Sequence, residues 1–278
     1  DTEWQFAAKL RWLFAINGYS TGLSLAVTGA LAVAGYGAAR AGWLRLDRTG
    51  AWLLAGFGVL FWAMPFRLFD TAFVDVRVLV AAVLIVPAFL DIRIPAGRPR
   101  RVAIAFLACV AAANLLTVAC IQIEYRAVYG TLERAFAVLP REPRILVADA
   151  ADATSLPADL ADLAAWHAAL LAVPAADAFV PTLFTYPGKQ PIRPRPAVRA
   201  IAVSEGGPVP WATLAAIAAG RPQPGAPRFV ENWTHDFGFV LLTRPGLLDG
   251  PPPAWLEPLA ASSRATLFRI RPTPATAP

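Results

Sequence analysis

The stretch MPFRLFDTAFVDVRVLVAAVLIVPAFLDIR, residues 64–93, places a few charged residues between long apolar runs. Asp70, Asp75 and Arg77 lie in its first half, and a further Asp–Arg pair closes it. Charged groups beside a lipid bilayer are costly unless they lie at the interface or line a cavity. The stretch therefore predicts an interfacial turn followed by a helix within the membrane.

The composition of the whole chain favours a membrane protein. Of its 278 residues, 57% are hydrophobic and only 16% are charged, whereas soluble proteins carry about a quarter charged residues. The net charge of +6 would suit a nucleic acid. However, the basic residues are spread along the chain and flank apolar runs, where they orient a membrane protein. We therefore expect the lipid bilayer as a partner and no nucleic acid.

Apolar runs on either side of the opening stretch extend the membrane pattern. The candidate spans are residues 19–39, 51–66, 78–90 and 102–123. A helix of about twenty residues crosses a bilayer. The third run is shorter, so it is either a re-entrant segment or a span completed by Arg77 and Arg93, whose side chains can snorkel at its ends. The sequence predicts an α-helical membrane bundle of four spans followed by a small α/β extracytoplasmic domain.

The loops between the spans predict the orientation. Arg residues dominate the loop after the first span and the loop after the third, whereas charges balance in the loop between the second and third. Loops rich in Lys and Arg stay in the cytoplasm. We therefore expect a multi-pass protein of a bacterial inner membrane with its C-terminal domain in the periplasm.

The composition changes near residue 139, because 22 of the 26 Pro residues lie from Pro140 onward. We expect three parts: an interfacial amphipathic helix over residues 1–16, a transmembrane region with four helices over 17–128, and a periplasmic α/β domain with a frayed Pro-rich tail over 129–278. In the first helix, Lys9 and Arg11 are expected to face lipid phosphates; the alternative is that this segment is the end of a preceding span or an ordinary loop helix. The chain is expected to be the C-terminal part of a longer protein.

The charged turn of the opening stretch is the first candidate binding site. Arg77, with Asp75 and Asp70, lies at the predicted outward end of the third span, where it could bind the phosphate of a lipid-linked donor. The alternative is that the Arg and Asp side chains pair with one another and simply flank the span.

A basic Pro-rich segment is the second candidate. Lys189, Arg193 and Arg195 lie close together in TYPGKQPIRPRPAVR, residues 185–199, with Tyr186 and Arg199 beside them. These side chains could bind an anion such as a lipid phosphate or a sugar phosphate. The alternative is a solvated loop that its prolines hold semi-rigid and extended.

The sequence predicts no metal site and no cofactor. Glu231, His235 and Asp236 are close in sequence, but no Cys or second His lies nearby to complete a set of ligands. The turn after the predicted strand at 144–149 lacks the glycines of a phosphate-binding loop. No GxSxG motif of a hydrolase occurs. A divalent metal is left open only for a longer, full-length protein.

The segment FVDVR, residues 73–77, and the Pro-containing run after it resemble a late R-Y-x-x-P region of polyprenyl-phosphate-dependent membrane glycosyltransferases of the C superfamily. The order of interfacial helix, final spans and periplasmic α/β domain is also similar. The resemblance implies that Arg77 contacts a lipid phosphate and that a catalytic Asp lies upstream of Asp1. Val78 stands where the pattern has Tyr.

A second segment, DAFVPTLFTYPGKQPIRPRP, residues 177–196, resembles part of multi-span membrane proteins of alphaproteobacteria. Two functions follow as hypotheses. The first is the C-terminal portion of a glycosyltransferase-like protein that moves a sugar from a polyprenyl-phosphate carrier on the periplasmic side. The second is a membrane-anchored periplasmic module that binds a partner or assists assembly without catalysis.

Overall fold

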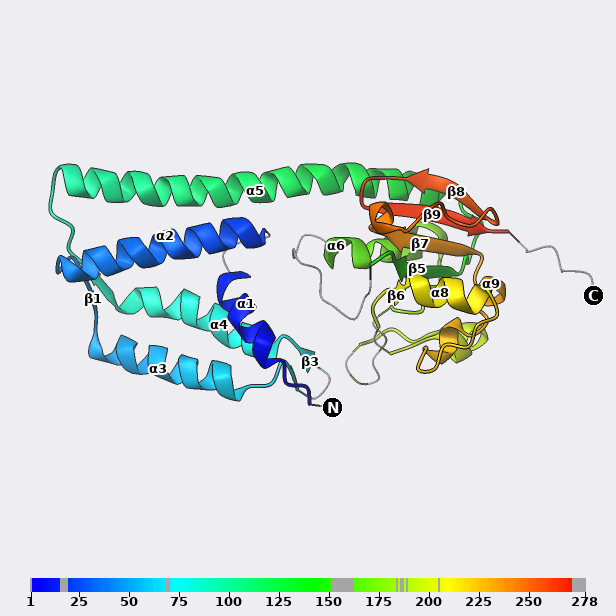
Figure 1. Cartoon of the computed structure of the whole chain (residues 1–278), viewed down its shortest axis with the longest axis horizontal. Coiled ribbons are helices and arrows are strands. Elements are labelled where there is room, and N and C mark those ends of the chain that lie inside the picture. The colour runs from blue at the N-terminus through cyan, green and yellow to red at the C-terminus, as the bar shows by residue number, and fades with distance from the viewer. Residues whose placement is uncertain are drawn as a thin grey trace, which may run out of the picture. The chain divides into compact units, whose positions relative to one another are not determined.

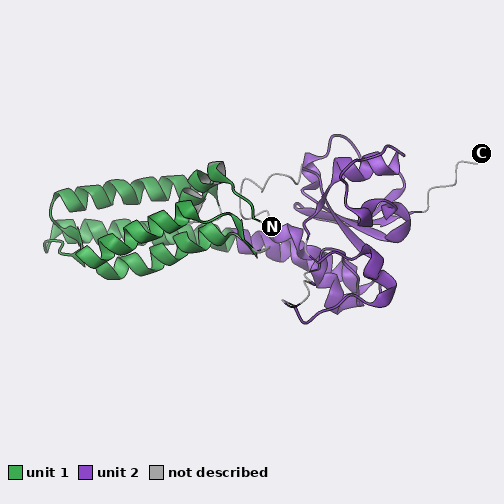
Figure 2. Cartoon of the chain, turned by 90° about the horizontal axis from the view of Figure 1, so that it is seen from below, with its two compact units in different colours: residues 1–120 green, residues 121–278 purple. Residues whose placement is uncertain are grey.

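A computed structural model describes residues 2–15, 20–68, 71–151, 163–183, 185, 188, 190–204 and 206–271. The chain forms two compact units, residues 1–120 and 121–278, which Figure 2 shows in different colours. We call them unit 1 and unit 2 and describe each by itself.

Unit 1 consists of helices joined by very short strands. Its elements are α1 (Phe6–Ala15), α2 (Thr21–Arg40), β1 (Leu44–Leu46), α3 (Arg48–Ala63), β2 (Arg67–Leu68), β3 (Thr71–Ala72), α4 (Val74–Ile85), the 3-10 turn η1 (Val86–Phe89), β4 (Leu90–Ile92) and the first part of α5 (Arg98–Ala137). Asp47 is the N-cap of α3, and its side chain accepts a hydrogen bond from the Gly50 amide at 2.6 Å. There is no room for a side chain at Gly50 of α3, since a Cβ at this position would lie 2.5 Å from the Cβ of Phe89.

The prediction of a four-span membrane bundle is wrong. Among the described residues, only α2 and α5 are both long and apolar enough to cross a membrane. The second predicted span, 51–66, is helical only as α3, with 16 residues. The third, 78–90, overlaps α4, whose 12 residues reach about 18 Å. Its helix gives way to η1 around Pro87, because proline cannot continue the hydrogen-bond ladder.

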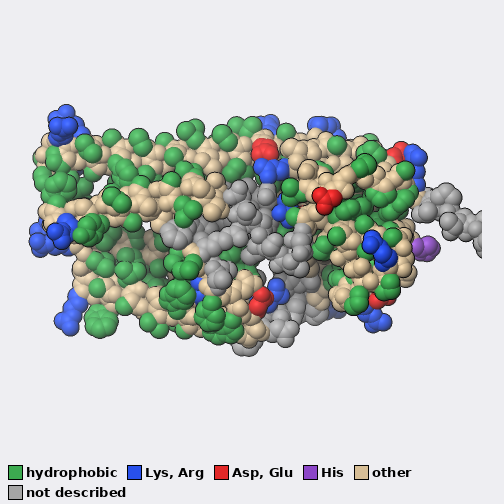
Figure 3. All heavy atoms as spheres, viewed as in Figure 1, with side chains coloured by type: hydrophobic (Ala, Val, Ile, Leu, Met, Phe, Trp, Pro, Cys, Tyr) green, Lys and Arg blue, Asp and Glu red, His purple; other side chains and the backbone are tan. Residues whose placement is uncertain are grey.

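The two long helices expose their apolar side chains. In α2, Val33 is 73% exposed, and in α5 the side chains of Leu115 and Ile123 are 70% and 71% exposed. The most apolar part of α5 has no buried residue. Figure 3 shows hydrophobic side chains spread over the helices of unit 1. Protein surfaces of this kind are normally covered by lipid or by another protein.

Basic side chains gather at one end of unit 1. Strand β1 pairs with β4 in antiparallel register, with Arg45 opposite Asp91, so the two Arg-rich loops lie side by side. The exposed Arg residues there are Arg40, Arg45, Arg48, Arg93, Arg98, Arg100 and Arg101. Figure 3 shows Lys and Arg side chains in blue at this end of unit 1, where Figure 1 labels β1.

Unit 2 is built on a mixed five-stranded sheet of order β6-β5-β7-β9-β8. Its strands are β5 (Ile145–Asp149), β6 (Val209–Pro210), β7 (Phe239–Thr243), β8 (Leu256–Ala261) and β9 (Ala265–Ile270), and its helices beyond α5 include α6 (Leu163–Trp166), η3 (Ala168–Leu171), α7 (Ala172–Ala176), η4 (Pro196–Ile201), α8 (Trp211–Ala218), η5 (Arg228–Val230), α9 (Trp233–Asp236) and η6 (Pro245–Leu247). Strand β5 is parallel to β6 and β7. Strand β9 is antiparallel to both β7 and β8.

The sheet of unit 2 is covered on both faces. Strand β5 is fully buried. Its side chains point alternately to the two faces of the sheet, as they do in any strand. Ile145 and Val147 join a core formed with the last turns of α5, including Leu132. Leu146 joins a second core with α8, η5 and α9. Figure 1 shows α5 on one side of the sheet and α8 and α9 on the other.

The sequence predicts several elements of unit 2 correctly. The buried strand expected over 144–149 is β5, and the late strands expected in FGFVLLTRPG and RATLFRIRP are β7 and β9. Strand β8 was not predicted, because it follows a run of prolines. The segment 177–186 is expected as a strand interrupted by Pro181, and among its described residues the structure has an isolated bridge from Phe179 to Arg144.

An ion pair ties the turn between β8 and β9 to α5. The Arg264 guanidinium donates Nε to Glu124 Oε1 at 2.7 Å and Nη2 to Oε2 at 3.2 Å. It also lies 6.0 Å from the ring centre of Tyr125. The hydrogen bond from Arg264 holds the pKa of Glu124 below its ordinary value. The sheet is therefore held against α5 from the first turn after its apolar run.

Replacing a buried leucine of α5 tests this packing. Leu132 is 0% exposed, and Leu132→Ala should lower the free energy of opening of unit 2 by about 2–5 kcal/mol, as expected for a buried Leu. Hydrogen exchange of the β5 and β7 amides measures that free energy. Leu247→Ala is the control, because Leu247 is 57% exposed. Equal effects of the two changes would contradict the packing described.

The Glu124–Arg264 pair predicts a pH dependence. Because the folded-state pKa of Glu124 is lowered, its stabilising contribution is present above the ordinary carboxyl pKa and is lost as the pH falls through the folded-state pKa. The contribution should be less than about 1 kcal/mol, since both side chains are partly exposed. Glu124→Gln should flatten the decrease in thermal stability of unit 2 below about pH 4.5. Glu133→Gln, an exposed change on the same helix, should leave that decrease as it is.

Candidate functional site

A buried lysine joins three helices of unit 1. Lys9 of α1 is 0% exposed. Its Nζ donates to the carbonyl oxygens of Phe61 at 2.5 Å and Met64 at 2.7 Å, and it lies 3.2 Å from Asp75 Oδ2. The two carbonyls are at the end of α3, and Asp75 is in the first turn of α4. The ammonium therefore neutralises the negative end of one helix and the acidic side chain that begins the next.

This arrangement changes the expected roles of the charged turn. Asp75, a predicted lipid-phosphate contact, is fully buried and paired with Lys9. Lys9, expected to face lipid phosphates, has no exposed surface. Arg77 lies two residues further along α4 with an exposed side chain, and it makes no ion pair within the described residues. Asp70 lies outside the described residues. The turn thus presents Arg77 as the charged group open to a ligand.

The basic Pro-rich segment lines a pocket of unit 2. The pocket has a volume of about 470 Å³ and includes Arg193 and Arg199, with Thr185, Gln190 and Ser204 as further polar groups. Both Arg side chains are exposed, and within the described ranges neither has a hydrogen bond or ion pair. Ligand pockets in proteins range over about 300–1,000 Å³. The pocket therefore has the size and charge to hold a small anion-bearing molecule.

The remaining predicted anion-binding residues are placed differently. Arg195 pairs with Glu142, just before β5, so its charge is already neutralised. It lines a neighbouring pocket with Arg144 and Asp177, which Arg193 also reaches. Lys189 lies outside the described residues. Of the two predicted residues that the structure describes, Arg193 is the one that lines the 470 Å³ pocket.

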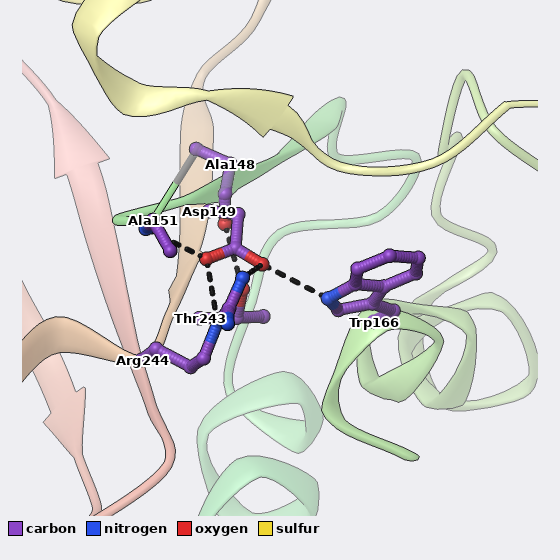
Figure 4. Close-up of polar contacts among 6 residues, drawn as sticks. All are labelled: Ala148, Asp149, Ala151, Trp166, Thr243 and Arg244. Carbon is purple, nitrogen blue, oxygen red and sulfur yellow. Dashed lines mark hydrogen bonds and ion pairs between the residues drawn. The ribbon is translucent and has the colours of Figure 1, made fainter. Parts of the chain in front are cut away.

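A third polar cluster lies where β5 and β7 end (Figure 4). Asp149 is 0% exposed. Its Oδ1 accepts from the Ala151 amide at 3.0 Å and from Arg244 Nε at 2.9 Å, and its Oδ2 accepts from Arg244 Nη2 at 2.8 Å and from Trp166 Nε1 at 2.9 Å. Arg244 holds this position with a left-handed φ of 53°, which is uncommon for a residue other than glycine.

The carboxyl ends of parallel strands are where α/β domains usually bind ligands. The position of Asp149 at the end of β5 therefore raises the question whether its carboxylate could act on a ligand. Four donors already saturate its carboxylate, which leaves no lone pair for a substrate proton or a nucleophilic attack. The cluster therefore acts as a tie between the ends of β5 and β7 and the short helix α6. A charged Asp after a buried strand was the signal in the sequence, but its partner Arg244 lies 95 residues away.

No metal centre is formed in the part of the chain that the structure describes. There, no group of three His, Cys, Asp or Glu side chains is placed to hold a metal ion. The weak candidates Glu231, His235 and Asp236 form no such group there, although His235 Nδ1 lies 3.8 Å from Asp236 Oδ1.

Comparison of the chain with family models, with curated proteins and with solved structures found no match. No family membership follows, and the resemblance of the FVDVR segment to glycosyltransferases stays a hypothesis.

The buried pair of Lys9 and Asp75 generates a prediction. Asp75→Asn or Lys9→Met should lower the stability of unit 1 by about 3–5 kcal/mol, because either change leaves the partner charge buried without compensation. The double variant Lys9→Met/Asp75→Leu should lose less than the sum of the single changes. Thermal unfolding of the detergent-solubilised chain measures these effects.

The control is the exposed pair of Asp91 and Arg93, whose side chains are 45% and 79% exposed. Asp91→Asn should cost less than about 1 kcal/mol. If Asp75→Asn were as mild as Asp91→Asn, Lys9 would not be joining the helices of unit 1.

Proposed function

We propose that this chain is a membrane-inserted protein whose α/β unit binds a small ligand that carries phosphate groups. The observation that carries the proposal is the pocket in which Arg193 and Arg199 are open and unpaired within the described residues. Guanidinium groups bind phosphate through paired, charge-assisted hydrogen bonds. The hydroxyl and amide groups of Thr185, Gln190 and Ser204 suit the hydroxyls of a sugar. A sugar phosphate is therefore the proposed ligand class.

Membrane insertion is supported by α2 and α5. Both are long and apolar enough to cross a bilayer, and both expose their apolar side chains. The exposed Arg residues at one end of unit 1 match the excess of basic residues in cytoplasmic loops. The α/β unit follows the other end of the apolar run of α5, which supports a periplasmic location for it in a bacterial inner membrane.

The α/β unit is proposed to bind its ligand without transforming it. In this unit the described acidic groups nearest the sheet ends are engaged, since Asp149 is saturated by donors and Glu124 is paired with Arg264. A general acid or base has to be within hydrogen-bond reach of the substrate and free to exchange a proton.

Ligand binding can be tested with glucose 1-phosphate and inorganic phosphate as probes, by calorimetry on the full chain in detergent. Arg193→Gln and Arg199→Gln should each weaken binding of glucose 1-phosphate about tenfold or more, because each removes a charge-assisted hydrogen bond. Arg221→Gln is the matched control, since Arg221 is exposed and outside the pocket. No binding by the unchanged chain, or equal losses in all three variants, would overturn the proposal.

A second candidate is the polyprenyl-phosphate-dependent transferase activity. The observation that favours it is Arg77, which is exposed, while the nearby acidic Asp75 is already neutralised by Lys9. An open guanidinium at the start of α4 suits the phosphate of a lipid carrier.

The transferase candidate predicts that Arg77→Gln weakens retention of polyprenyl phosphate by the detergent-solubilised chain at least about tenfold. Native mass spectrometry with added polyprenyl phosphate measures retention. Arg45→Gln is the control, because Arg45 is also exposed and lies in the basic end of unit 1. Unchanged retention in the Arg77 variant would remove the role assigned to Arg77.

A further inference from the structure

One edge of the sheet in unit 2 lies beside the point where α5 stops being apolar. Strands β5 and β7 end at Asp149 and Thr243, and Thr243 pairs with Ala265 at the start of β9. We define this carboxyl edge as residues 149–151, 243–247 and 262–265. The Arg244 amide donates to the Arg264 carbonyl at 2.9 Å, which joins the two halves of the edge.

Arg264 also connects this edge to α5. It forms its bidentate ion pair with Glu124, and Glu124 directly follows Ile123, the last residue of the apolar run 102–123. The other edge of the sheet lies at the far end of the helix, because α5 ends at Ala137 and a short connection leads into the start of β5 at Ile145. The helix thus runs antiparallel to β5. From Glu124 to Ala137 it covers roughly 20 Å at 1.5 Å per residue.

The groups near this junction suit the headgroup layer of a membrane. Arg126 is exposed and makes no ion pair with any described residue. It lies three residues, or about 4.5 Å, beyond Ile123, and shares a surface pocket with Tyr129. Basic and aromatic side chains are the ones that favour headgroup depth. Leu247 at the carboxyl edge is 57% exposed and adds an apolar group.

We propose that the carboxyl edge of the sheet lies against the headgroup layer of the bilayer that α5 crosses. The proposal rests on the membrane insertion proposed above. It goes further, because it names the edge of the sheet that is near the lipid: within unit 2, the ion pair of Glu124 and Arg264 holds the carboxyl edge next to the last apolar residues of α5. The ends of β5 and β7 then meet the phosphates of phospholipid headgroups, and the starts of these strands face the aqueous phase.

Spin-label depth measurements test this orientation in the full chain, reconstituted in vesicles of phosphatidylcholine and phosphatidylglycerol. Cys109→Ala and Cys120→Ala first remove the native thiols. Single cysteines are then introduced by Leu247→Cys and, as a second position on the same edge, Gly246→Cys. Val138→Cys is the matched control at the other edge, because Val138 is 83% exposed. Leu115→Cys marks the apolar run of α5.

Power saturation with oxygen and a water-soluble nickel complex reports the depth of each label. The labels at 246 and 247 should lie at headgroup depth, and the label at 138 should lie in water, roughly 20 Å further from the bilayer centre. If the labels at 246 and 247 were as far from the bilayer as the label at 138, with Leu115→Cys in lipid, the orientation would be wrong and membrane insertion would stand. If Leu115→Cys were also in water, membrane insertion itself would fail.

Discussion

Within a single turn, α5 changes from a helix that is apolar on every side to one that is apolar on one face. The sheet of unit 2 packs against that face. In the apolar run of α5, up to Ile123, the most apolar part has no residue buried by the protein. From Tyr125 onward it buries one face, with Val128, Leu132 and Phe136 against the sheet. The same helix that suits lipid over its apolar run therefore also packs against the sheet of the α/β core over its last turns.

Each unit is organised by an ion pair between parts of the chain far apart in sequence. In unit 1, Lys9 meets Asp75 and the end of α3. In unit 2, Arg244 closes on Asp149. Buried ion pairs contribute little net stability compared with apolar packing, but breaking one partner is costly. Their effect is therefore to specify which helix or strand ends meet. Both ion pairs engage a buried Asp that would otherwise be the first candidate for a catalytic group. The exposed arginines are then the groups open to ligands.

The sequence predicted what depends on local pattern and failed where distant residues decide. The buried strand β5 and the long continuation of α5 follow from runs of apolar residues with the right period. The four-span bundle was wrong, because apolar runs of 13 to 16 residues satisfied the hydropathy pattern and α3 and α4 stop short of a bilayer's thickness. The role of Lys9 could not be predicted, since the carbonyls it contacts lie more than 50 residues away. The open Arg193 and paired Arg195 look alike in sequence and differ only through Glu142.

The central claim is that lipid surrounds the apolar run of α5, and its two native cysteines test this directly. Cys109 and Cys120 are both exposed in the folded chain, so folding alone does not protect them. In sealed vesicles, a membrane-impermeant maleimide should fail to label either cysteine until a denaturing detergent dissolves the bilayer. It should label Val138→Cys, just beyond the end of α5, without detergent. Only the fraction of chains inserted with this residue on the outside of the vesicle should react. Labelling of Cys109 and Cys120 in intact vesicles as fast as at position 138 would contradict the account.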